Sequence, residues 1–160
     1  MKKIQLSEIK PGIGLGQIKF GMSREEVKSL LGKPNEIIEE AYDEERKDRY
    51  DSWEYHELYV DFTFDQENDW RLSGISVYSD EYLLFNEPLI GLDKVELMDQ
   101  FTALQINDIE FEDMSSEEAP DHHLFSSDKT QINFWVDLNI LIEIQWSPFY
   151  LDDETIKWPD

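Results

Sequence analysis

The chain of 160 residues contains no cysteine. Disulfide bonds, thiolate metal sites and cysteine nucleophiles are therefore excluded, and stability must come from packing. Long apolar runs are also missing, because the first three residues lead into a mixed stretch at 4–16 and no segment reaches membrane-spanning length. We therefore expect neither a signal peptide nor a membrane span, and we expect a cytoplasmic protein.

Basic residues are scarce. There are 14 Lys and Arg against 37 Asp and Glu, a net charge of −23. The imbalance is uneven, since residues 1–33 carry +4 while 95–128 hold ten acids and no Lys or Arg. Nucleic acid is a poor partner for such a chain, because phosphate backbones bind to basic surface. Two explanations stay open, namely solubility and a basic protein partner that relieves the self-repulsion.

A short helix is marked at both of its ends. Ser23 is a favoured N-cap residue and Glu26 stands three positions later, which is the capping-box spacing. Gly32 and Pro34 are typical of the residues that follow a helix. The pattern returns at 91–101, where Asp and Glu take the two capping positions. This recurrence predicts a duplicated unit.

Strands are predicted after the first helix. Residues 52–57, 58–65 and 72–79 tend to alternate large apolar with polar side chains, which is the period of a strand with one buried face. Similar alternation recurs at 133–137 and 142–145. The residues predicted to face the core are Val60, Phe62, Phe64, Ile75, Val77, Phe134, Val136, Ile142 and Ile144.

Together these patterns predict an α+β fold of two tandem repeats. Each repeat would be a short helix followed by an antiparallel β-meander, with the helices packed on one face of the sheet or sheets. The first repeat would span 1–80, including an N-terminal segment, and the second 81–160, including an acidic and aromatic tail. We expect the two to form one compact body.

The helix motif resembles one found in the β-lactamase-inhibitor-protein and SmpA/OmlA (outer-membrane assembly lipoprotein) type of module. The resemblance is carried by Gly21-Met22-Ser23, Glu26-Val27 and Leu31-Gly32-Lys33-Pro34, which lead into the meander. It implies a module that binds other proteins and does not catalyse a reaction. The inhibitors are disulfide-bonded and the lipoproteins carry a lipid-attachment cysteine, so the absence of cysteine here points to an intracellular version.

The expected contact surface combines acids with aromatic anchors. The acidic stretch 108–121 would face a basic partner, and Trp and Tyr are the side chains that most often anchor interfaces. The predicted partner-binding residues are Asp108, Glu110, Glu112, Asp113, Glu117, Glu118, Asp121, Trp53, Tyr55, Trp135 and Trp146. The favoured function is an immunity protein that neutralises a basic, nuclease-type toxin domain. No catalytic residue, metal or cofactor is predicted, and the oligomeric state is left open.

Two alternatives remain at this stage. One is a structural or regulatory module that binds a host-cell protein through a sheet edge or through the tail 148–160. The other, more remote, is a metal-dependent hydrolase that uses His122 or His123, with Asp121 and His56 as further candidates. Adjacent histidines on a strand face opposite sides, which argues against both of them binding one metal.

Overall fold

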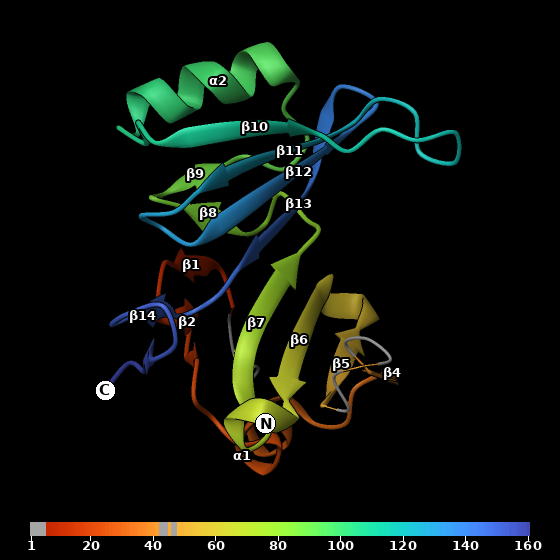
Figure 1. Ribbon diagram of the computed structural model, residues 1–160, viewed down its shortest axis with the longest axis vertical. Helices are drawn as coiled ribbons and strands as arrows, with labels where there is room; N and C mark the ends of the chain where they lie inside the picture. The colour runs from red at the N-terminus through yellow and green to blue at the C-terminus, as the bar shows by residue number, and fades with distance from the viewer. Residues whose placement is uncertain (1–5, 42–44, 46–47) are drawn as a thin grey trace.

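The computed structural model describes residues 6–41, 45 and 48–160. Its main element is an eight-stranded antiparallel sheet in the order β10-β11-β12-β13-β7-β6-β5-β4 (Figure 1). The strands of one half are β4 (Glu36–Ala41), β5 (Arg49–Tyr55), β6 (Val60–Asp65) and β7 (Arg71–Val77). Those of the other half are β10 (Ile109–Asp113), β11 (His122–Ser127), β12 (Ile132–Asp137) and β13 (Ile140–Trp146). The three strands predicted between residues 52 and 79 are thus confirmed.

The two halves of the sheet meet at β7 and β13. Three residue pairs join these strands, among them Gln145 opposite Ser76 and Trp146 opposite Ile75. Short 3-10 turns, η1 (His56–Leu58) and η2 (Gln66–Asn68), connect β5 to β6 and β6 to β7. Because this pairing joins the two halves into one sheet, side chains on the same face of all eight strands can form one continuous surface.

A second sheet of five very short strands packs against the first. Its order is β3-β2-β1-β8-β9, and the pairing of β1 with β8 is parallel. The strands are β1 (Glu8–Lys10), β2 (Gly14–Leu15), β3 (Ile18–Lys19), β8 (Leu83–Leu84) and β9 (Glu87–Pro88). Trp146 Nε1 donates a hydrogen bond of 3.2 Å to the Gly14 carbonyl, which ties the large sheet to the small one. A final hairpin is formed by β14 (Phe149–Tyr150) and β15 (Ile156–Lys157).

The two helices are short and carry the predicted caps. In α1 (Arg24–Leu31) the Ser23 hydroxyl accepts from the Glu26 backbone N–H and the Glu26 side chain accepts in return, and Gly32 ends the helix with a φ of 83°. In α2 (Lys94–Ala103), Asp93 and Glu96 form the same reciprocal pair. Figure 1 shows α1 and α2 at opposite ends of the molecule.

The predicted α+β fold of two tandem repeats, with helices packed on one face, is wrong. The chain is mostly β, with one sheet of eight strands and a second, unpredicted sheet of five, whereas the helices have 8 and 10 residues. The helices bury few side chains, Val27 in α1 with Leu97 and Phe101 in α2, so strands supply most of the core. The reason is size, because helices of two or three turns offer little apolar area compared with eight paired strands. The proposed division near residue 80 stays a prediction.

The core lies on one face of the large sheet. Eight of the nine residues predicted to face it are buried, and the exception is Ile142, which is 39% exposed. A β-bulge between Trp135 and Val136 shifts the pairing so that Leu141, with no exposed surface, takes the inward position. An extra residue at a bulge moves every following side chain to the other face, which the sequence pattern did not reveal.

Candidate functional site

The outward face of the large sheet carries one continuous line of polar side chains, which we call the polar row. Each strand contributes one residue, and cross-strand pairing places the eight side by side. The row runs Glu110, Ser126, Asn133, Gln145, Ser76, Asp61, Glu54 and Glu36. The alternate side chains point to the core, because successive residues of a strand face opposite ways. The sheet thus has one apolar and one polar side.

Acids gather near the middle of the polar row. Tyr78 Oη donates a hydrogen bond of 2.7 Å to Asp61 Oδ2. Burial raises the pKa of Asp61, and the charge of Glu54 raises it further against the lowering effect of the Tyr78 hydrogen bond. Burial also raises the pKa of Glu143, and the charge of Asp61 raises it further against the lowering effect of hydrogen bonding to Ser76 and Tyr78. A positive charge placed nearby would therefore stabilise the ionised form of each carboxylate.

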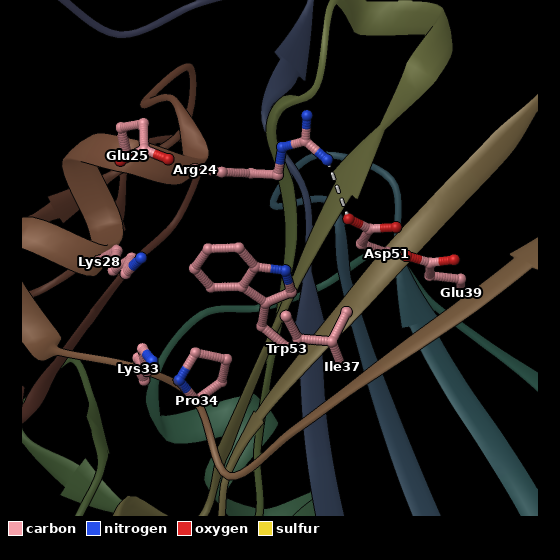
Figure 2. A pocket seen from close by; sticks show the side chains of 9 residues that line it. All are labelled: Arg24, Glu25, Lys28, Lys33, Pro34, Ile37, Glu39, Asp51 and Trp53. Atoms are coloured by element: carbon pink, nitrogen blue, oxygen red, sulfur yellow. Dashed lines mark hydrogen bonds and ion pairs between the residues drawn. The ribbon is translucent and has the colours of Figure 1, made fainter.

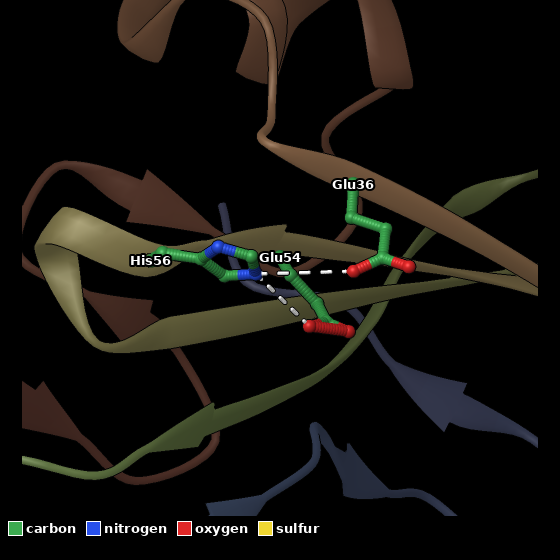
Figure 3. A group of neighbouring side chains, drawn as sticks. All are labelled: Glu36, Glu54 and His56. Atoms are coloured by element: carbon green, nitrogen blue, oxygen red, sulfur yellow. Dashed lines mark hydrogen bonds and ion pairs between the residues drawn. The ribbon is translucent and has the colours of Figure 1, made fainter.

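A histidine and two carboxylates meet at the β4 end of the row, as Figure 3 shows. His56 Nε2 lies 3.2 Å from Glu54 Oε1 and 4.0 Å from Glu36 Oε2. Among the described residues this trio could offer one ligand atom each to a cation, since the three atoms lie within 4.8 Å of one another. The side chains of His56 and Glu36 are more than half exposed, so the same geometry also suits an ordinary surface ion pair.

An aromatic group lies on the same face. The His122 and Trp135 rings are stacked, with centroids 5.2 Å apart and planes 12° from parallel. Trp135 Nε1 donates to Gln145 Oε1 at 3.2 Å, which fixes the indole beside the polar row. His123, the neighbour of His122, faces the other way and lies 3.0 Å from the Lys94 ammonium through its Nδ1. The two histidines thus lie on opposite sides of the strand, as their adjacency predicts.

A separate pocket of about 510 Å³ lies between α1 and the strands β4 and β5, on the other side of the sheet (Figure 2). Its side chains carry both signs of charge. Lys28 lies on the helix side, whereas Asp51 on the strand side pairs with Arg24 at 3.0 Å. Trp53 lines the pocket, and its Nε1 has no hydrogen-bond partner among the described residues. The balanced charges favour neither an anion nor a cation.

Three of the predicted aromatic contact residues are in the core, which corrects that part of the prediction. Trp53 and Tyr55 are 5% exposed and Trp146 is 1% exposed. Each stands at an inward position of its strand, where a large apolar ring stabilises the fold rather than a complex. Trp135 alone among the predicted aromatics is on the outward face, half-buried beside Gln145.

The predicted acidic residues do not form one surface. Glu110 and Glu112 lie on the outward side of β10, the edge strand, and both are exposed. Glu117 and Glu118 are exposed in the connection between β10 and β11. These four are available to a partner.

The other three acids make contacts within their own chain. Asp108 accepts from the Ser127 hydroxyl at 2.8 Å and from the Lys129 backbone N–H at 2.9 Å. These bonds, with the Lys129 N–H the largest influence, lower the pKa of Asp108. Asp113 and Asp121 lie 3.6 and 3.5 Å from His123 Nε2, on the side of the sheet away from the polar row.

Comparisons with known proteins give little. No family model matches the chain, and no curated protein does. A solved structure described as an extracellular protein containing a SCP domain, from Bacillus anthracis str. Ames, matches with a TM-score of 0.47 and 13% sequence identity. The match covers 92% of this chain and 49% of that one, so the chain spans about half the length of that protein. In the described part of the chain, neither helix has the length and apolar character needed to cross a membrane.

Proposed function

We propose that this protein acts by binding another protein, without catalysis, and that the polar row is its contact surface. The observation that supports this most directly is the row itself, which brings four carboxylates onto one face of an eight-stranded sheet. The opposite face is covered by the small sheet and by side chains from both helices. The outward face has no such cover among the described residues, and its side chains are mostly half-exposed.

The partner we propose is basic. With a net charge of −23 the protein attracts cationic surfaces and repels anionic ones at long range. Eight strands spaced about 4.8 Å apart give a row about 34 Å long, which is enough to support an ordinary protein interface. A cationic side chain would also offset the burial that, with the charges of neighbouring acids, raises the pKa values of Asp61 and Glu143.

The inhibitor interpretation follows from this charge pattern. Nuclease-type toxin domains are basic because they hold phosphate, so an acidic protein can cover their active site and gain association rate through electrostatic steering. We therefore propose an immunity protein that works in the cytoplasm. The resemblance of the helix motif to protein-binding modules agrees with a binding role.

The test compares two triple variants of equal charge. Glu36→Gln, Glu54→Gln and Glu143→Gln together remove three charges from the outward face, whereas Glu81→Gln, Glu87→Gln and Glu154→Gln remove three elsewhere on the surface. The product of the neighbouring upstream gene, taken as the candidate toxin, is titrated with each by calorimetry at about 50 and about 300 mM salt. We expect the outward-face triple to weaken binding by about 100-fold and the control triple by less than about fivefold. Equal losses would reject the polar row as the contact surface.

The alternative in which the tail 148–160 binds a host-cell protein has less support. The ring of Phe149 occupies the space beside Gly12, and the ring of Trp158 packs against Gly21. Arg71 lies over Trp158, 5.5 Å from the ring centre. The tail thus packs on its own chain, and a partner would have to displace these contacts to use it.

A further inference from the structure

A small polar pocket opens beside the junction of the two half-sheets. Its volume is about 210 Å³, and side chains from β6, β7, β12 and β13 line it. Gly74 and Thr63 both stand in its wall, and a Cβ at residue 74 would lie 3.3 Å from the Thr63 Cβ. Asn133 and Gln145 of the polar row line it as well. The pocket therefore belongs to the same outward face as the proposed contact surface.

Asp65 gives this pocket its negative charge. It is only 9% exposed, and its Oδ2 accepts hydrogen bonds from Ser73 Oγ at 2.5 Å and Asn68 Nδ2 at 3.4 Å. Its Oδ1 is buried and has no hydrogen-bond partner among the described residues. Buried carboxylate oxygens are nearly always paired, so the hydrogen bonding of Asp65 is incomplete within the described residues.

The chain does not supply a cation for Asp65 from the described residues. Arg71 stands opposite Asp65 in the pairing of β6 with β7, yet its guanidinium lies over the Trp158 ring. Burial raises the pKa of Asp65, and the charge of Glu67 raises it further against the lowering effect of the Ser73 and Asn68 hydrogen bonds. The carboxylate is thus desolvated without a counter-ion.

We propose that this pocket receives the guanidinium group of one arginine side chain from the partner protein. A guanidinium is a planar cation with five N–H donors, which suits a carboxylate surrounded by hydroxyl and amide oxygens. The volume is below that of typical small-molecule pockets, so a single side chain is the better match. That the arginine comes from a protein rests on the function proposed above, whereas the preference of the pocket for a guanidinium does not.

The probe is N-acetyl-arginine amide, added to the ¹⁵N-labelled protein and followed by NMR. Its neutral counterpart, N-acetyl-citrulline amide, has the same shape without the charge. We expect the arginine compound to shift the amide signals of Gly74 and Gln145 saturably in the millimolar range, and the citrulline compound to bind about tenfold more weakly or not at all. Equal binding of the two compounds, or shifts scattered over the acidic surface without these residues, would overturn the proposal.

Two variants test whether the charge of Asp65 is what binds the arginine compound. Asp65→Asn should weaken binding of the arginine compound about tenfold, whereas Asp69→Asn, the same change at an exposed position nearby, should leave it unchanged. Asn also tolerates the φ of 56° at residue 69. If Asp65→Asn does not fold, as thermal melting would show, Gly74→Ala narrows the pocket with its charge intact and should weaken the arginine compound by a similar factor. If Asp65→Asn folds and binds the arginine compound with wild-type affinity, the proposal is contradicted. If Asp65→Asn does not fold, wild-type affinity in Gly74→Ala contradicts it instead.

The titration needs no partner, so its outcome is separate from that of the proposed function. If the arginine compound does not bind while the outward-face triple still loses the toxin, only the pocket proposal fails. If it binds while the outward-face triple retains the toxin, the pocket preference holds and the polar row is rejected as the contact surface. If it binds while the wild-type protein does not bind the toxin, the pocket preference holds and the proposed function fails.

Discussion

The two faces of the large sheet are made by neighbouring residues of the same strands, and they differ in burial and in polarity. On β6, Phe62 has no exposed surface while Asp61 beside it reaches solvent. On β13, Trp146 is buried against the small sheet while Gln145 belongs to the polar row. The inward face supplies the buried apolar contacts, and we expect changes of charge on the outward face to affect the fold less. Function is therefore expected on the outward face.

The largest predicted loss of stability comes from a substitution on the inward face. Phe62→Ala removes a fully buried ring that packs edge-on against Tyr55, with ring centres 5.7 Å apart. We expect a loss of about 4 kcal/mol in the free energy of unfolding, measured by urea denaturation, since the cavity cannot collapse fully. Thr63→Ala, on the outward side of the same strand, should cost less than about 1 kcal/mol. Similar costs for the two would contradict the division between the faces.

A smaller effect is predicted where the two sheets meet. Trp146→Phe removes the hydrogen bond from Nε1 to the Gly14 carbonyl and leaves a small cavity. We expect a loss of about 2 kcal/mol, because a buried acceptor loses its donor. Thermal unfolding measures the loss, and Trp135→Phe on the outward face is the control, with an expected loss of less than about 1 kcal/mol.

The smallest predicted effect concerns pH and the outward acids. Burial raises the pKa values of Asp61 and Glu143 above those of the unfolded chain, so the folded state binds their protons more tightly. Stability from these groups is therefore present at low pH and is lost as pH rises through the folded pKa values. Asp61→Asn with Glu143→Gln should raise the free energy of unfolding at neutral pH by less than about 1 kcal/mol, seen as a slightly higher melting temperature, and the gain should vanish on acidification. A melting temperature lowered at neutral pH would reverse this sign and contradict the account.

Much of the local structure could be predicted from the sequence. The Ser23 and Glu26 spacing marked the start of α1, and the alternation around Phe62 marked both β6 and its inward face. The small sheet could not be predicted, because strands of two or three residues show no period and the parallel contact of Ile9 with Leu84 joins distant parts of the chain.

The candidate site was predicted only in part. Glu110, Glu112 and Trp135 are on the outward face, but Trp53 and Trp146 were expected at an interface and are core residues. An aromatic residue suits either place, and only the strand register decides between them. The polar row was missed for the same reason, since it exists only after eight strands are paired.

The proposed function depends most on where a partner binds. The measurement that tests this directly is the change in backbone amide signals of the ¹⁵N-labelled protein when the toxin domain is added. We predict that the largest changes follow the polar row, from Glu36 through Asp61 and Ser76 to Asn133. Changes confined to the small sheet or to the pocket beside α1, with the polar row unaffected, would contradict it.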